Sequence, residues 1–488
     1  MREARLSDKI TFGTDGWRDV IAENFTFPNV RRVAAAIGRY ILATYGDQRP
    51  VIVGHDTRFL ARDFARTSVH ILNGAGLRTL LVERDAPTPV VAFSALHPPA
   101  SAEGRQAGSA GAVMITASHN PPEYCGIKYI PDYAGPATKE ITDRIVGELG
   151  SLAGELAVGA EDGEVFDPAP AYKAAVARYL DMERIARAGL SVAYDAMHAT
   201  GRGYTDALLE EAGCQVTTLR ATLDPLFGGA MPEPAPRFLD GLSATVRSRK
   251  LALGLANDGD ADRFGVIGED GRCYTPNQVI ALLARHLHKN RHMDGAIVRT
   301  VATTHLLDRL AAAYGLPLRE TPVGFKWVGA VMRAEPVLIG GEESGGLSVL
   351  GHIPEKDGVL ADLLVAEMIA FEGKPLGQIW TDLVAEIGFE PATRRLDLHL
   401  AEEAKLALID YLKERTPASV AGFKVVDRNT TDGVKLRLEN GSWLLARPSG
   451  TEPIVRVYLE APDAASLGRL ESAAQELVAR ATVPAAAR

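Results

Sequence analysis

The sequence predicts three similar α/β domains with mixed sheets, followed by a C-terminal α+β domain, all arranged around a central cleft. A strand–helix–strand pattern occurs three times, and each copy continues into an apolar strand that ends in an unusual polar loop. Strands that alternate with helices are typical of α/β units with a largely parallel sheet. The last part of the chain has a different pattern of alternating strands and two helices, which predicts a domain with its own core.

The length of the chain agrees with this number of domains. The chain has 488 residues, and about three or four domains are expected at roughly 100–200 residues per domain. We expect the α/β domains at 1–155, 156–270 and 271–385, and the α+β domain at 386–488. The expected linkers are 150–163, 265–275 and 371–392.

Composition and charge exclude several classes of protein. Apolar residues make up 46% and charged residues 24%, which is typical of a globular chain and not of collagen, a coiled coil or a disordered protein. The net charge of −9 argues against a nucleic-acid partner. The chain has no run of about 18 apolar residues and no signal-peptide pattern, so we expect no membrane partner. Three scattered cysteines fit neither a disulfide framework nor a zinc site and predict a reduced, cytoplasmic protein.

The three copies of the pattern predict the strands of the α/β domains. Ligands of such sheets bind beyond the carboxyl ends of the strands, so we expect the three polar loops to meet in one cleft. The predicted strands are 51–53, 76–82 and 113–115 in the first copy, 191–194, 213–219 and 253–256 in the second, and 296–298, 315–321 and 337–339 in the third.

The C-terminal domain is predicted to contain four strands and two helices. Its hairpin is marked by Asn440 and Gly441, a pair that favours a tight turn. The expected strands are 394–400, 433–439, 442–446 and 455–459, and the expected helices are 402–415 and 464–480.

The first polar loop, 116–122, has the sequence TASHNPP. Small residues and two prolines after a buried strand predict a rigid turn with exposed side chains. Ser118 is a candidate nucleophile or phosphate carrier. His119 is not expected to be its general base, because adjacent side chains diverge; His119 and Lys128 would instead stabilise charge on a transferred group. An ordinary capped turn is the alternative.

The second polar loop, 258–263, has the sequence DGDADR. Three carboxylates separated by small residues can surround one hard cation, and oxygen-only ligation suits Mg²⁺. An EF-hand is excluded because Arg263 stands where that loop requires glycine and because a strand, not a helix, is predicted next. A solvated acidic turn is the alternative, although three like charges this close repel one another unless a cation offsets them.

Three further segments contribute groups that can bind a sugar phosphate. The loop 341–346 offers carboxylates and a hydroxyl for sugar hydroxyls, and the segments 321–327 and 352–358 add cations and an imidazole. The loop 447–453, followed by Arg456, combines hydroxyls, glycine and arginine, which can form a phosphate nest. Plain turns are the alternative in each case.

Together these loops predict metal-assisted phosphoryl transfer. A hydroxyl nucleophile, a triple-aspartate loop and a separate phosphate nest fit this chemistry. Basic residues inside the loops of an acidic protein indicate a small anion as ligand. The chain has neither a Gly-x-x-x-x-Gly-Lys-Ser/Thr loop nor a kinase signature, so ATP is not the expected donor.

Five segments resemble, in order, the motifs of the α-D-phosphohexomutase family, which includes phosphoglucomutases and phosphomannomutases. These segments are 13–18, 116–121, 258–263, 341–345 and 447–453, and their order and spacing extend over essentially the whole chain. The resemblance implies three similar α/β domains and a fourth α+β domain around a deep cleft. It also implies an intramolecular phosphotransferase of the EC 5.4.2 class.

The resemblance also implies a role for each candidate residue. Ser118 would carry the phosphoryl group and would bind Mg²⁺ together with Asp258, Asp260 and Asp262. Charge on the moving group would be stabilised by His119, Lys128, Arg263 and Arg18. The residues expected to bind substrate are Gly324, Phe325, Lys326, Glu342, Ser344, Lys356, Arg447, Ser449, Gly450, Thr451 and Arg456.

The reaction implied is glucose 1-phosphate to glucose 6-phosphate, with glucose 1,6-bisphosphate as intermediate and activator. Mannose phosphates are a further expected substrate, and a phosphoglucosamine mutase is the alternative within the family. A Mg²⁺-dependent hexose phosphatase and a non-catalytic sugar-phosphate sensor are the alternatives from other classes. Small-molecule hexose phosphates are the expected partners of a monomer or homodimer.

Several positions depart from the family pattern. Cys125 stands where asparagine is usual, and Asp19 where glycine is common. Gly346 replaces a histidine that bifunctional members often carry, which leaves Lys128, Lys356 and His352 as candidate general acid or base. Residues 97–106 are expected to form an inserted loop.

Overall fold

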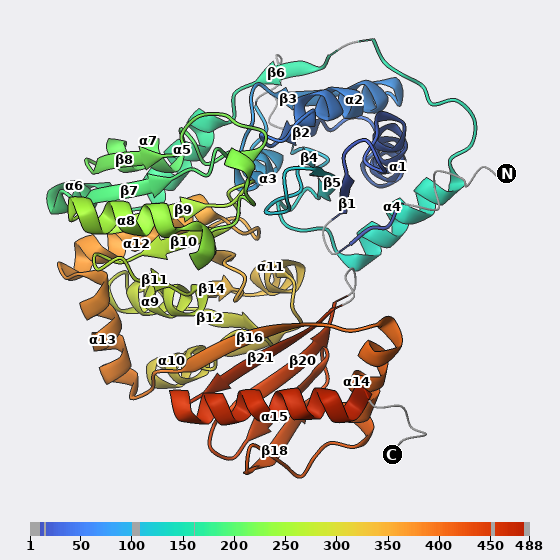
Figure 1. Ribbon diagram of the computed structural model, residues 1–488. Helices are drawn as coiled ribbons and strands as arrows, with labels where there is room; N and C mark the ends of the chain where they lie inside the picture. Colours follow the sequence, from blue (N-terminus) through green and yellow to red (C-terminus); the bar gives the residue numbers. More distant parts are fainter. Residues whose placement is uncertain (1–9, 14–15, 100–107, 161, 450–453, 483–488) are drawn as a thin grey trace.

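The computed structural model describes residues 10–13, 16–99, 108–160, 162–449 and 454–482. Four sheets follow one another along the chain, each with its own helices (Figure 1). The first three sheets mix parallel and antiparallel strands, and the fourth is antiparallel. The predicted architecture of three α/β domains and a C-terminal α+β domain is therefore confirmed.

The first sheet has the strand order β1-β5-β4-β2-β3-β6. Its central strands β2, β3 and β4 run parallel, and β5 returns antiparallel to β4, so the loop between them closes at the carboxyl end of β4. The strands are β1 (Trp17–Val20), β2 (Val51–His55), β3 (Thr79–Val82), β4 (Ala112–Ile115), β5 (Tyr124–Ile130) and β6 (Glu164–Phe166), and the helices are α1 (Phe27–Tyr45), α2 (Ala61–Gly74), α3 (Thr88–Leu96) and α4 (Lys139–Ser151).

The second sheet has the order β11-β10-β9-β7-β8, in which β9 and β10 form an antiparallel hairpin. The turn of that hairpin is the triple-aspartate loop, so the loop lies at the carboxyl end of β9. The strands are β7 (Ser191–Asp195), β8 (Gln215–Leu219), β9 (Leu253–Asn257), β10 (Phe264–Ile267) and β11 (Cys273–Tyr274); the helices are α5 (Ala169–Tyr179), α6 (Met182–Ala188), α7 (Thr205–Glu211) and α8 (Asp240–Arg249), with short 3₁₀ turns η2 (Phe227–Gly229) and η3 (Pro236–Phe238).

The third sheet has the order β13-β12-β14-β15. Its first helix, α9, begins with a capping box in which Thr275 and Gln278 exchange side-chain and backbone hydrogen bonds, which satisfies amides that a helix start leaves open. The strands are β12 (Ala296–Thr300), β13 (Leu318–Thr321), β14 (Val337–Gly341) and β15 (Leu347–Val349), and the helices are α9 (Pro276–Lys289), α10 (Leu306–Tyr314), α11 (Phe325–Ala334), α12 (Gly358–Glu372) and α13 (Leu376–Ile387).

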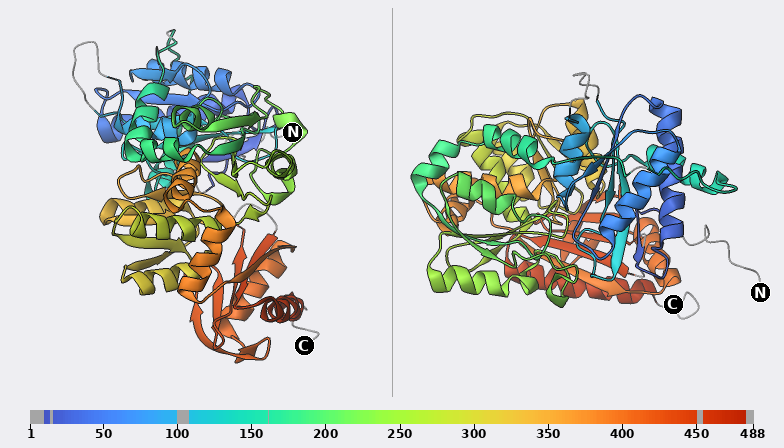
Figure 2. Two further views of the ribbon diagram at one scale, coloured as in Figure 1. Left: turned by 90° about the vertical axis from the view of Figure 1, so that its left-hand side faces the viewer. Right: turned by 90° about the horizontal axis from the view of Figure 1, so that it is seen from above.

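The C-terminal sheet has the order β16-β21-β20-β19-β18-β17, with α14 and α15 packed against it. The predicted hairpin is present, because β19 pairs with β20 around the Asn440 turn. This domain lies at one end of the molecule, beside the third domain (Figure 2). The strands are β16 (Ala392–His399), β17 (Ser419–Val420), β18 (Phe423–Asn429), β19 (Val434–Leu438), β20 (Trp443–Pro448) and β21 (Ile454–Ala461), and the helices are α14 (Glu402–Glu414) and α15 (Ala464–Thr482).

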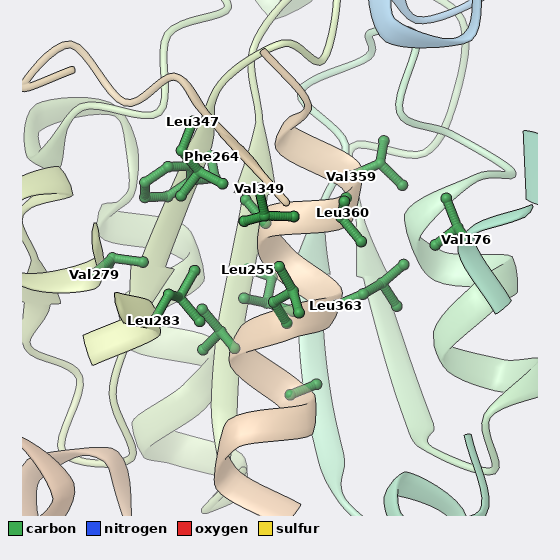
Figure 3. Packing of buried hydrophobic residues seen from close by; sticks show 14 of the residues in the cluster. Val176, Leu255, Phe264, Val279, Leu283, Leu347, Val349, Val359, Leu360 and Leu363 are labelled. Carbon is green, nitrogen blue, oxygen red and sulfur yellow. The ribbon is translucent and has the colours of Figure 1, made fainter. Parts of the chain in front are cut away.

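The first three domains share one large hydrophobic cluster, the first domain has a second cluster of its own, and the fourth has a separate core. Helix α12 runs through the shared core and is buried along most of its length, which agrees with its apolar side chains on every face. Leu360 and Leu363 on this helix pack near Leu255 of the second sheet and Leu283 of α9 (Figure 3). The three domains that carry the polar loops are therefore held by one common core.

Two of the expected linkers are wrong. Segment 265–275 contains most of β10 and all of β11, and segment 371–392 contains α13. Leu376, Ile379, Trp380 and Leu383 form the buried face of α13, and this helical spacing of apolar residues was present in the sequence. Residues 100–106 of the expected inserted loop lie outside the described part of the chain.

Strand β6 follows residue 155, where the first domain is predicted to end, yet it pairs with β3 of the first sheet. The short strand β11 follows residue 270 and pairs with β10 of the second. The four boundaries stay predictions. No helix within the described ranges is long and apolar enough to cross a membrane.

Candidate active site

The first two polar loops touch each other, as expected from their positions at the carboxyl ends of β4 and β9. The buried Ser118 hydroxyl donates a hydrogen bond to Asp258 Oδ2 at 2.9 Å. Gly259 makes the close approach possible, because a Cβ atom there would lie 2.3 Å from the Ser118 carbonyl oxygen. Residues 140 positions apart thus form one site across two domains.

Ser118 has an unusual backbone conformation. Its φ of 51° is in the left-handed region, which a non-glycine residue rarely adopts. The Ser118 amide donates to Thr116 Oγ1 at 2.8 Å, which supports the turn. In this conformation Ser118 Oγ lies 3.3 Å from His119 Nδ1. The expectation that the two adjacent side chains diverge is therefore wrong, because it assumed ordinary backbone angles.

His119 is held as a neutral imidazole. Burial, together with the cations of Arg263 and Arg18, holds its pKa well below the usual value. A neutral ring can accept or donate one hydrogen bond on each nitrogen, depending on its tautomer. His119 can therefore serve the Ser118 hydroxyl as a hydrogen-bond partner without adding a full positive charge.

The three aspartates of the second loop form a cluster that can hold a divalent cation. Asp258, Asp260 and Asp262 are buried, and each offers a carboxylate oxygen within 4.8 Å of the other two. Among the residues described, Asp260 Oδ1 and Asp262 Oδ1 are buried without a hydrogen-bond partner. Buried unpaired carboxylate oxygens are costly, and oxygen ligands at this spacing suit Mg²⁺. The residues present therefore fit the expected metal.

Electrostatics within the cluster are unequal. Burial and the neighbouring carboxylates of Asp260 and Asp262 raise the pKa of Asp258 well above its usual value. Burial also acts to raise the pKa of Asp260, but Lys128 and the Thr88 hydroxyl outweigh it, and the pKa is lowered. Nearby protein cations therefore already offset part of the negative charge that a bound metal ion would neutralise.

Two lysines lie against the cluster. Lys128 Nζ on β5 lies 3.3 Å from Asp260 Oδ2, and Lys356 Nζ lies 3.1 Å from Asp262 Oδ2. Gly346 provides the space for the second lysine, because a Cβ atom there would lie 2.2 Å from Lys356 Cδ. The absence of a side chain at Gly346 therefore leaves the space that Lys356 occupies.

His352, the third candidate acid or base, bonds Asp357 instead of the aspartate cluster. His352 Nε2 lies 2.7 Å from Asp357 Oδ2, and the Tyr172 hydroxyl also donates to that carboxylate. Asp357 in turn caps the start of α12 by accepting from the Leu360 amide at 2.9 Å. The geometry therefore brings Lys128 and Lys356 to the aspartate cluster, and assigns His352 to the support of α12.

Two arginines complete the surroundings of Ser118. The Arg263 amide donates to Asp258 Oδ1 at 3.0 Å, and its guanidinium Nε lies 4.0 Å from Asp262 Oδ1. Arg18 on β1 donates to Asn120 Oδ1 at 3.1 Å, within the Ser118 loop. Both predicted charge-stabilising arginines thus lie beside the loops that they were expected to serve.

The predicted sugar-binding loop is joined to the segment before α11. The Gly324 amide donates to Glu342 Oε1 at 2.9 Å. Burial and the carboxylate of Glu343 raise the pKa of Glu342 to about 7. Ser344 is exposed and Lys326 is half-buried, whereas the Phe325 ring is buried against the third sheet. The Lys356 ammonium lies 5.4 Å from the centre of that ring.

The predicted phosphate-binding segment presents two arginines on adjacent strands. Arg447 on β20 and Arg456 on β21 are directly opposite each other in the sheet. Opposed like charges destabilise a sheet unless a counter-charge is present. Arg447 Nε donates to Asp432 Oδ2 at 2.7 Å, and Lys405 Nζ donates to the Ser449 carbonyl at 2.9 Å. The other two predicted residues, Gly450 and Thr451, lie outside the described residues.

Comparison with known protein families covers the whole architecture. Models described as phosphoglucomutase/phosphomannomutase match at 9–153 (α/β/α domain I), 170–271 (domain II), 275–387 (domain III) and 400–477 (C-terminal domain). The chain belongs to the phosphoglucomutase/phosphomannomutase family. It is therefore a mutase, an intramolecular phosphotransferase, as the resemblance implied.

Individual members of the family agree with this assignment. A probable phosphoglucosamine mutase of Methanopyrus kandleri is 32% identical over 92% of this chain and 93% of its own. A phosphoglucomutase/phosphomannomutase of Thermococcus kodakarensis is 33% identical over 92% of this chain and 94% of its own. The crystal structure of a putative phosphomannomutase of Thermus thermophilus is 36% identical, with a TM-score of 0.84, and covers 96% of this chain and 99% of that chain.

The sequence reasoning missed several residues that hold this mutase site together. Thr88, at the start of α3, donates to Asp260 Oδ2 at 2.7 Å. The Asn257 side chain donates from Nδ2 to the Arg263 carbonyl at 3.1 Å and so closes the aspartate loop on itself. Arg58 donates to the Ser118 carbonyl at 2.6 Å. The polar run after β2 was a signal for Arg58, whereas no sequence pattern marked Thr88.

Proposed function

We propose that this mutase interconverts glucose 1-phosphate and glucose 6-phosphate through a phosphoserine at Ser118 and a glucose 1,6-bisphosphate intermediate. The observation that carries the proposal is the buried Ser118 hydroxyl, 2.9 Å from Asp258 in a cluster with unpaired carboxylate oxygens. An alcohol beside a divalent-cation site is suited to carry a phosphoryl group. Mannose phosphates are proposed as a second substrate.

Different site residues are proposed for metal binding, for charge stabilisation and for proton transfer. Asp258, Asp260 and Asp262, with phosphorylated Ser118, would hold Mg²⁺, which supplies positive charge against the phosphate oxygens when bound. His119 lies beside the Ser118 hydroxyl, Arg18 bonds Asn120 of the same loop, and Lys128 and Arg263 lie at the aspartate cluster. We assign these four residues to the stabilisation of charge on the moving group. The proton of the accepting sugar hydroxyl needs a nearby base, for which Lys128 and Lys356 are the candidates beside the cluster.

Substrate binding is assigned to the other two loops. Glu342 is placed to accept hydrogen bonds from sugar hydroxyls, with Ser344, Gly324, Phe325 and Lys326 beside it in sequence or space. Arg447 and Arg456, which lie opposite each other in the C-terminal sheet, are proposed to hold the phosphate that does not react. The resemblance assigns Ser449, Gly450 and Thr451 to the same phosphate. Binding energy from this phosphate would position the reacting end.

A phosphoglucosamine mutase is the second candidate. Its support is the name of the Methanopyrus kandleri relative, a probable phosphoglucosamine mutase at 32% identity. The sugar loop carries two adjacent carboxylates, Glu342 and Glu343, and an amino group would be attracted to them. Glu343 Oε2, however, accepts from the Thr300 hydroxyl at 3.1 Å, so it is already used within the third domain.

The test combines mass spectrometry with a coupled assay on three sugars. After incubation with glucose 1,6-bisphosphate, we expect a phosphoryl group on the Ser118 peptide and loss of turnover in Ser118→Ala. Turnover of glucose 1-phosphate should exceed that of glucosamine 1-phosphate; the reverse order would establish the second candidate. Release of inorganic phosphate faster than isomerisation would indicate a phosphatase, and normal binding without any turnover would indicate a sensor.

A further inference from the structure

Arg58 makes an unusual set of contacts beneath the Ser118 loop. It follows β2, and its side chain is completely buried. The guanidinium donates to four backbone carbonyls, three in that loop and one at the first residue of β5. These are the carbonyls of Ser118 and Asn120, each at 2.6 Å, of Pro121 at 2.7 Å and of Tyr124 at 2.9 Å.

The remaining donor of the guanidinium is also used. Arg58 Nε lies 3.2 Å from Asp56 Oδ2, and the Arg58 amide donates to Asp56 Oδ1 at 2.9 Å. A guanidinium has five N–H donors in a rigid planar arrangement, and all five are therefore engaged. Phe227 of the second domain lies on one face of the group, with its ring centre 5.0 Å from Arg58 Cζ.

We propose that Arg58 is a positioning residue for phosphoryl transfer: it shapes the Ser118 loop so that the hydroxyl faces the aspartate cluster. This inference rests on the function proposed above. The Ser118 carbonyl that accepts from Arg58 is also the atom that the aspartate loop approaches at Gly259. The position of that carbonyl therefore determines both the backbone angle of Ser118 and its distance from Asp258.

The geometry separates this role from simple support of the first domain. Lysine at position 58 would keep the positive charge and most of the stem, but it offers three donors at a single point instead of a five-donor fork. Such a variant keeps the core of the domain and loses the four-carbonyl clamp. A misplacement of about 1 Å in a reacting group can lower a rate roughly 100-fold, so we expect the variant to lower kcat. Among the described contacts, Arg58 has none with the predicted sugar or phosphate loops, so we expect little change in KM.

The experiment compares Arg58→Lys with Arg291→Lys as a matched control. Arg291 is also an arginine that bonds a buried carboxylate and a backbone carbonyl, those of Glu367 and Tyr179, but it follows α9, is 21% exposed and makes none of the contacts with the Ser118 loop. In Arg58→Lys we expect kcat to fall roughly 100-fold while KM for glucose 1-phosphate changes less than about threefold. The rate at which glucose 1,6-bisphosphate labels Ser118 should fall in parallel. Arg291→Lys should keep kcat within about twofold.

The outcomes distinguish the two proposals. If wild-type protein takes no label on Ser118, the proposed function fails. If wild-type protein is labelled and folded Arg58→Lys is labelled equally fast, with unchanged kcat, Arg58 has no positioning role. Circular dichroism and the melting temperature establish folding. Should Arg58→Lys not fold, Asp56→Asn decides the question: it keeps an acceptor but loosens Arg58 Nε, and an unchanged kcat there would overturn the inference.

Discussion

At the scale of single residues, the site depends on side chains whose ordinary properties are changed by burial. Ser118 has a left-handed backbone angle that directs its hydroxyl to Asp258 and its neighbour His119. Gly346 leaves the space that Lys356 needs in order to reach Asp262. These positions are predicted to be sensitive to changes of one methyl group or one proton.

Gly346→Ala should lower activity without unfolding the protein. The added methyl group would lie 2.2 Å from Lys356 Cδ and displace that side chain, so we expect kcat to fall about tenfold or more. Gly147→Ala is the control, because nothing lies within 4 Å of a Cβ atom there and the residue is inside α4. That change should raise the free energy of unfolding by up to about 1 kcal/mol. Equal kcat in both variants would contradict the role given to Gly346.

Glu342 should give the activity a pH dependence near neutrality. Its pKa is raised from 4.5 to about 7 by burial and Glu343, so the protonated carboxyl is favoured in the folded protein. Its contribution to stability is present below pH 4.5 and is lost as pH rises through 7. The ionised form accepts more sugar hydroxyls, so kcat/KM for glucose 1-phosphate should rise through this range. In Glu342→Gln the rise due to this group should disappear; an unchanged profile would contradict its role.

At the scale of elements, the polar loops are placed by strand ends and by one buried helix. Helix α12 crosses the shared core, and its first residue, Gly358, donates its amide to the Ala261 carbonyl of the aspartate loop at 3.1 Å. A Cβ atom at Gly358 would lie 2.2 Å from the Arg263 carbonyl oxygen. The start of α12 therefore supports the aspartate loop directly.

Asp357→Ala should destabilise the protein more than the loss of a helix cap alone. It removes the cap of α12 and leaves the buried Tyr172 hydroxyl and His352 without their acceptor. We expect the free energy of unfolding to fall by about 2–4 kcal/mol in urea denaturation. Thr275→Ala, which removes only the side-chain cap of the exposed start of α9, should cost about 1 kcal/mol. Similar losses in the two variants would show that Asp357 acts only as a cap.

At the scale of the whole molecule, three domains share a core, and the fourth is attached to the third by polar contacts and by a small apolar cluster of Val301, Ala302, Trp443, Leu445 and Tyr458. Lys435 of the C-terminal domain is buried and donates to the Val301 carbonyl at 2.7 Å, with its Nζ 2.8 Å from His305 Nε2. The Asp432 carboxylate accepts from the Val323 amide at 3.0 Å. The C-terminal domain therefore has its own core and a hydrogen-bonded attachment next to the sugar loop.

Lys435→Met should loosen this attachment. The variant keeps much of the apolar stem but leaves the Val301 carbonyl without its donor, which costs about 1–3 kcal/mol. We expect faster cleavage by protease between α13 and β16, together with a higher KM for glucose 1-phosphate. Lys424→Met is the control. Lys424 lies on β18 and bonds Glu439 through its backbone amide, so this change should affect neither the rate of proteolysis nor the KM. An unchanged rate of proteolysis in Lys435→Met would contradict a role of Lys435 in attaching the C-terminal domain to the third.

The number and kind of domains, most strands, and the residues of the Ser118 and aspartate loops could all be predicted from the amino-acid sequence. Alternating patterns and turn residues are local signals, and a strand end fixes where its loop must lie. The folded chain was needed to show that His119 turns toward Ser118, that Lys356 and not His352 reaches the aspartates, and that Arg58 lies beneath the loop. Those facts depend on a backbone angle and on contacts between residues far apart in the chain, which no local pattern encodes.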